Sequence, residues 1–156
     1  MTTTLPYIKS QLTDEETRHL IELGICLDYA TPYTFSAPYR TSGISIAHVF
    51  TLTNLVEIVP KGFVVKSEDN IDSETESLVY LNTYYHPFRG TWIVQYNYIS
   101  ALKDDGVSSN KTLYSTSSVE LIDALYQTLL WLLEHGYVED LTKPRNETKF
   151  NQYRPV

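Results

Sequence analysis

The longest helical pattern of the chain, residues 117–135, carries very few polar side chains. At about 100° per residue, the polar positions fall in one stripe of roughly 60°. These polar residues are Glu120, Asp123, Gln127 and Glu134. Apolar side chains cover the opposite side of the helix, and Leu130 and Trp131 lie on either side of the stripe. A helix that is apolar over so wide an arc needs more than one covering neighbour, so this segment predicts the organising element of a core.

Two shorter helices are predicted in the amino-terminal part. The first begins at a capping box in which Thr13 is followed by Glu16, and Gly24 ends it. The second covers residues 51–59, with Thr51 or Thr53 as its cap and Pro60 closing it.

Alternating and β-branched residues predict an antiparallel sheet. A short strand is predicted at residues 44–50, and the strands at 63–66, 78–85, 91–99 and 112–114 are expected to form the sheet, with a hairpin loop at 86–90. Residues 29–43 contain two prolines and several aromatic side chains, which favour an irregular loop held by aromatic anchors. The predicted fold is α+β, in which a small sheet of about three to five strands packs on the long C-terminal helix beside the short N-terminal helices.

The length of 156 residues predicts a single domain over residues 1–156. Residues 138–156 are polar, lack periodicity and are expected to form a C-terminal tail that is ordered only where it docks.

The charge balance limits the classes of partner. The net charge is −7, which opposes nucleic-acid binding because phosphates need lysine and arginine side chains. Neither a signal segment nor an apolar run of membrane-spanning length is present, so a cytoplasmic location without membrane contact is expected. The single cysteine, Cys26, has no metal-ligand spacing around it.

No arrangement of residues indicates catalysis. The four histidines do not pair with one another at helical or metal-ligand spacing, and the six glycines form no phosphate-binding loop. A Ser45–His48 pair on a strand would point to opposite faces. We therefore expect no enzyme, no cofactor and no metal site.

Tyrosine is the unusual residue of the composition, with 13 copies. Its apolar body and polar tip suit interfaces and shallow clefts as well as half-buried strands. The candidate binding residues are Tyr29, Tyr33, Phe35, Tyr39, Arg40 and Arg89. The first hypothesis is a non-enzymatic module that binds another protein. The alternative is a small-ligand or nucleotide binder, with tyrosines stacking on a ring and Arg40 or Arg89 contacting phosphate. A third interpretation is that the tyrosines merely fill strands.

The two residues beside the polar stripe predict self-association. Leu130 and Trp131 lie where one sheet could not cover both. The amino-terminal segment, the tail or a second subunit must then cover them. Because cyclic dimers are the commonest closed assemblies, we expect a homodimer with these residues at or near the contact.

Three segments together carry a resemblance: residues 53–60, the hairpin with Gly90-Thr91-Trp92, and residues 120–127. Their combination resembles a group of small uncharacterised proteins of phages and mobile elements of intestinal bacteria. The resemblance covers residues 52–137, and the insertion at 67–76 departs from the group's compact pattern. It implies an accessory or inhibitor protein, anti-defence-like in role, in the cytosol of a bacterial host. It implies no particular chemistry.

Overall fold

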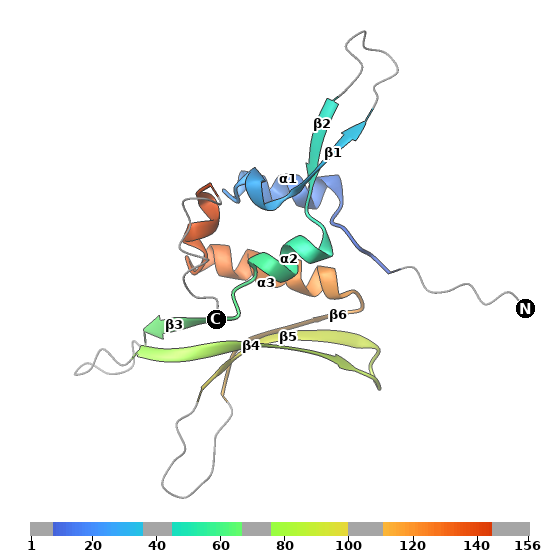
Figure 1. Cartoon of the computed structure of the whole chain (residues 1–156). Helices are drawn as coiled ribbons and strands as arrows, with labels where there is room; N and C mark the ends of the chain where they lie inside the picture. Colours follow the sequence, from blue (N-terminus) through green and yellow to red (C-terminus); the bar gives the residue numbers. More distant parts are fainter. Residues whose placement is uncertain (1–7, 36–44, 67–75, 100–110, 145–156) are drawn as a thin grey trace, which may run out of the picture. The chain divides into compact units, whose positions relative to one another are not determined.

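The computed structural model describes residues 8–35, 45–66, 76–99 and 111–144 (Figure 1). Within these residues the protein has three α-helices, a two-stranded sheet and a four-stranded sheet, both antiparallel. The predicted α+β class is therefore confirmed. Contacts divide the chain into two compact units, one of residues 1–58 with 132–156 and the other of residues 59–131. No helix in the described ranges is long and apolar enough to cross a membrane.

The first unit opens with α1 (Asp14–Glu22), which begins at the predicted capping box. The Thr13 hydroxyl accepts a hydrogen bond from the Glu16 backbone N–H at 3.1 Å, and the Glu16 carboxylate accepts one from the Thr13 N–H at 3.0 Å. Lys9 adds an ion pair to Glu16 at 2.8 Å. Burial alone would raise the pKa of Glu16, but the hydrogen bonds from Lys9 and Thr13 outweigh burial and lower it.

After the 3₁₀ turn η1 (Leu27–Tyr29), strands β1 (Thr31–Phe35) and β2 (Ser45–Val49) form an antiparallel ribbon. The prediction of an irregular loop is thus wrong for residues 31–35. Proline is tolerated in an edge strand, where its missing N–H need not serve a ladder, so Pro32 did not prevent β1 from pairing with β2. Residues 36–43 of the predicted loop lie outside the described residues.

Helix α2 (Leu52–Ile58) follows the ribbon. The Thr51 hydroxyl accepts a hydrogen bond from the Asn54 N–H at 3.2 Å, and the Asn54 side-chain oxygen accepts one from the Thr51 N–H at 2.9 Å. These reciprocal bonds make Thr51, rather than Thr53, the cap of the helix. The same Asn54 oxygen accepts a hydrogen bond from the Thr31 hydroxyl at 2.9 Å, which ties α2 to β1.

The third helix, α3 (Leu121–Glu134), is followed by Gly136, whose positive φ of 74° favours glycine and terminates the helix. A second 3₁₀ turn, η2 (Glu139–Thr142), follows. Val138 and Leu141 are buried, and the Leu141 carbonyl accepts a hydrogen bond from the Cys26 N–H at 2.8 Å. The first part of the predicted 138–156 tail is therefore ordered and docked, whereas residues 145–156 lie outside the described residues.

The second unit contains a meander with the strand order β3-β4-β5-β6. The strands are β3 (Gly62–Lys66), β4 (Glu76–His86), β5 (Thr91–Tyr98) and β6 (Thr112–Ser118). Strand β6 extends to Ser118, which pairs with Trp92, so α3 begins at Leu121 and not at Ser117 as predicted. Ser117 is part of β6 and is the register partner of Ile93, so it does not cap the helix as its spacing from Glu120 suggests.

The register gives the four-stranded sheet an inner and an outer face. Val79, Val94 and Tyr96 are fully buried on the inner face. The Trp131 ring of α3 stacks on Tyr114 with ring centroids 4.4 Å apart. The predicted apolar arc of α3 is buried at Ile122, Ala124, Leu125, Tyr126, Leu129 and Leu132. Gln127, from the predicted polar stripe, is exposed.

Candidate functional site

The binding residues that the sequence predicts do not form one site in the structure. Tyr29 is 4% exposed, and its hydroxyl is buried without a hydrogen-bond partner among the described residues. It is therefore a core residue. Tyr33 is 39% exposed on β1. Phe35 is the last residue of the same strand, and Tyr39 and Arg40 lie outside the described residues.

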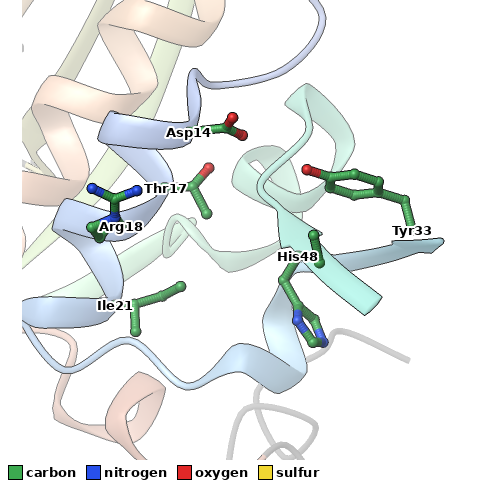
Figure 2. Close-up of a pocket in the computed structure, with 7 residues that line it drawn as sticks. Asp14, Thr17, Arg18, Ile21, Tyr33 and His48 are labelled. Carbon is green, nitrogen blue, oxygen red and sulfur yellow. The ribbon is translucent and has the colours of Figure 1, made fainter. Parts of the chain in front are cut away.

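Tyr33 borders a hollow of about 370 Å³ in the first unit (Figure 2). Four residues of α1 line it at positions that share one face of the helix, and three residues of the β1–β2 ribbon complete the lining. The lining residues are Asp14, Thr17, Arg18, Ile21, Tyr33, Ala47 and His48. Register pairing places Tyr33 beside Ala47. Tyr33 was predictable from its aromatic surroundings. The α1 residues were not, because only the packing of α1 beside β2 brings them near Tyr33.

The hollow is lined by charged, polar and apolar side chains that do not form a recognisable catalytic arrangement. Arg18 offers a cation that suits a phosphate or carboxylate, and the Tyr33 ring offers a flat apolar surface. The Thr17 hydroxyl accepts a hydrogen bond from the Phe50 N–H at 3.4 Å, so it serves the fold. In the described ranges, no group of three or more His, Cys, Asp or Glu residues could hold a metal ion. The hollow is open to solvent, which fits weak capture of a small anion or ring better than chemistry that excludes water.

A second candidate lies on the outer face of the four-stranded sheet. Val64 and Leu78 are register partners on β3 and β4, and the Ile99 N–H donates to the Leu78 carbonyl at 2.9 Å. Tyr80 follows two residues after Leu78 on the same face. The exposed fractions of these side chains range from 38% to 56%. We call Val64, Leu78, Tyr80 and Ile99 the outer cluster.

On the side of the outer cluster toward the β4–β5 turn, neighbouring positions of the outer face carry no cation, whereas on its other side Lys66 is the register partner of Glu76. The next rows of the register hold Asn97, Asn82, Gln95 and Ser115. Most exposed hydrophobic residues in proteins are scattered singly, whereas this group is contiguous across two strands and the residue after a third. The outer cluster is absent from the sequence-based candidates because the β3–β4 register and the contact between Ile99 and Leu78 join residues that are far apart in the chain. The alternation along β4 was the one available signal, since it places Leu78 and Tyr80 on a common face.

Arg89 lies in the turn between β4 and β5, where its N–H donates to His86 Nδ1 at 3.3 Å. Its side chain is exposed, and the adjacent Phe88 is 96% exposed. Trp131 is half-buried against Tyr114, and its ring centroid is 6.2 Å from that of Tyr96. Leu130 is half-buried. The sheet thus reaches Trp131, which removes part of the reason for expecting a subunit contact there.

Comparisons of this chain with known proteins found no similar protein. The chain matches no protein-family model, no curated protein and no solved structure.

Proposed function

We propose that this chain is a small non-enzymatic protein-interaction module and that the outer cluster is its contact surface. The proposal is carried by four large apolar side chains, between 38% and 56% exposed, that are contiguous on one face of an ordered sheet. Contiguous exposed apolar surface on a rigid element is typical of protein–protein contacts, especially when an aromatic residue is present.

Charge favours a protein partner over a nucleic acid. The chain carries a net charge of −7, and the described rows between Leu78 and Tyr84 contain neither lysine nor arginine. A nucleic acid would need cations beside the stacking tyrosine. A protein that presents an apolar patch with a basic rim would complement this surface instead. The resemblance to phage and mobile-element proteins makes an accessory or inhibitor role in the bacterial cytosol part of the proposal.

The test compares two matched variants of exposed apolar residues. Leu78→Lys places a charge inside the outer cluster, whereas Val119→Lys changes an exposed valine outside it. The wild-type chain is used to isolate its partner from the host, and the partner is identified by mass spectrometry. Titration calorimetry with the purified partner should then show binding weakened by about 10-fold or more for Leu78→Lys and nearly unchanged for Val119→Lys. Equal affinity of both variants would contradict the proposal.

A second candidate function is capture of a small anionic or ring-bearing ligand in the hollow at Tyr33. It is favoured by Arg18 and Tyr33 lining the same hollow, because a guanidinium and an aromatic ring together suit a nucleotide. Nuclear magnetic resonance titration with nucleoside monophosphates should shift the signals of Arg18 and Ile21 in the wild type. The shift of the Ile21 signal should disappear in the double variant Tyr33→Ala with Arg18→Ala. Absence of shifts in the wild type would contradict this function and leave the outer cluster unaffected.

A further inference from the structure

One half of β4 has no neighbouring strand on the β3 side among the described residues. Strand β3 pairs with β4 from Glu76 to Tyr80, whereas β4 continues to His86 and pairs there with β5 alone. The Leu81 N–H donates to the Lys61 carbonyl at 2.8 Å, so odd-numbered residues of β4 direct their backbone groups to the β3 side. By this alternation, Thr83 and Tyr85 direct an N–H and a C=O to the open edge. We call residues 82–86 the free edge.

The free edge lacks the features that keep other edges of this protein from pairing. Natural edge strands are blunted by proline, lysine, bulges or shortness. Strand β1 contains Pro32, and the β5–β6 ladder has a register irregularity at Tyr96 and Asn97. Strand β3 is five residues long. The free edge is also five residues long, but it contains no proline, lysine or register irregularity; its residues are Asn82, Thr83, Tyr84, Tyr85 and His86.

We propose that the free edge is the contact between two copies of this chain, which pair antiparallel about a two-fold axis at Tyr84. In this register Thr83 of one copy faces Tyr85 of the other, and each such pair exchanges two backbone hydrogen bonds. Tyr84 faces its own counterpart in the closer, non-hydrogen-bonded position, where aromatic cross-strand pairs stabilise a sheet. The contact joins two four-stranded sheets into one of eight strands.

A second copy fits this edge better than an unrelated strand because of charge and symmetry. Each chain carries a net charge of −7, so two copies can approach closely only where neither presents a charge. The free edge contains no Asp, Glu, Lys or Arg. Its hydrogen-bonding groups also match their own two-fold image, as a self-complementary contact requires. The proposal does not depend on the outer cluster or on its partner.

The first test removes a backbone donor. Thr83→Pro deletes an N–H that no described strand uses, so the folded chain should keep its far-ultraviolet circular dichroism. Sedimentation velocity between roughly 1 and 100 μM should show the wild type associating to a dimer and Thr83→Pro weakening that association by about 10-fold or more. The control Ser115→Pro deletes an outward-facing N–H at the opposite edge of the sheet, on β6, and should leave the dimer unchanged.

The second test locates the two-fold axis with cysteines in a Cys26→Ser background. Cβ atoms of a non-hydrogen-bonded pair lie close enough for a disulfide, so Tyr84→Cys should give a covalent dimer under mild oxidation. Asn82→Cys should not, because in this register it faces His86 and lies several residues from its own counterpart. A wild type that stays monomeric over this concentration range overturns the proposal. A dimer that survives Thr83→Pro, or that Tyr84→Cys fails to crosslink, overturns it as well.

Discussion

The two faces of the four-stranded sheet use the same kinds of side chain for different purposes. On the inner face, Tyr96 is completely buried and its hydroxyl donates to the Pro60 carbonyl at 2.7 Å. On the outer face, Tyr80 lies one strand away with 38% of its surface exposed. Valine shows the same contrast, since Val79 is 1% exposed and Val64 is 46% exposed.

This comparison shows that residue type does not distinguish core from contact surface in a tyrosine-rich sheet. The inner face is closed by Trp131 of α3 and by Phe63, whose ring centroid lies 4.8 Å from that of Tyr96 in an edge-to-face arrangement. No described element contacts the outer cluster in the same way. A one-residue shift of register would exchange the two faces, so register alone decides which tyrosines hold the fold and which are available to a partner.

The largest effect is expected from truncating one tyrosine on each face. Tyr96→Ala should lower the free energy of unfolding by about 3–5 kcal/mol, because it removes a buried ring and leaves a cavity. Tyr80→Ala should cost less than about 1 kcal/mol, because its ring already contacts water. Urea denaturation of both variants measures the difference, and similar losses would show that the two faces are not distinct.

Raising the pH should lower the free energy of unfolding through Tyr96 on the inner face. Burial, with a smaller contribution from Tyr114, raises the pKa of the Tyr96 phenol well above its ordinary value of 10.0. The unfolded chain releases this proton near that ordinary value while the folded chain retains it, so the stabilisation is present below the unfolded pKa and is lost as the pH rises above it. The loss approaches about 1.4 kcal/mol per pH unit.

Denaturant melts at pH 8, 10 and 11 would measure this loss in the wild type, in Tyr96→Phe and in the control Tyr80→Phe. The slope with pH should become shallower in Tyr96→Phe than in the other two proteins. Parallel slopes in all three proteins would assign the alkaline sensitivity to other groups.

Local signals in the sequence predicted much of the fold. The capping box at Thr13 depends on residues close together in the chain and is confirmed. The alternation of β5 is equally local, and it holds at Val94 and Tyr96 but not at Asn97, which is buried. The apolar arc of α3 is likewise confirmed by its buried residues. Predictions failed where pairing across the chain overrode a local pattern. Strand β1 contains Pro32 yet pairs with β2. Ser117, which the sequence predicts as the start of the long helix, belongs to strand β6 instead.

The candidate site was less predictable for a related reason. Aromatic residues around position 33 mark a region but do not tell a core anchor from a binding residue, and Tyr29 and Tyr33 differ in burial although they are four residues apart. The outer cluster combines β3, β4 and the residue after β5, so no window of sequence contains it. Its recognition required the register, which depends on contacts between residues far apart in the chain.

A smaller loss of stability is expected when only the hydroxyl of Tyr96 is removed and its ring is kept. Tyr96→Phe keeps the packing against Phe63 and Trp131 but leaves the Pro60 carbonyl without its donor. At neutral pH this change should cost about 1.5 kcal/mol, the magnitude for leaving a partly buried acceptor unpaired. Thermal and urea melts would show the loss, and Tyr84→Phe on the outer face is the matched control. A loss of equal size in Tyr84→Phe would mean that hydroxyl removal itself, and not the Pro60 contact, is responsible.

The smallest effect concerns an amide that departs from the general exposure of the outer face. Asn97 lies in the same register row as Tyr80 yet is 5% exposed, and its side-chain oxygen accepts a hydrogen bond from the Thr112 hydroxyl at 2.9 Å. Asn97→Ala should cost about 1 kcal/mol, less than Tyr96→Phe, because the exposed Thr112 hydroxyl can bond water instead. Gln95→Ala, at the half-exposed amide on the same face, should stay within about 0.5 kcal/mol of the wild type. Urea melts of both variants would reveal whether the hydrogen bond to Thr112 links β5 to β6 as strongly as this geometry implies. If Gln95→Ala costs as much as Asn97→Ala, the outer face is less accessible to water than its exposed tyrosines indicate.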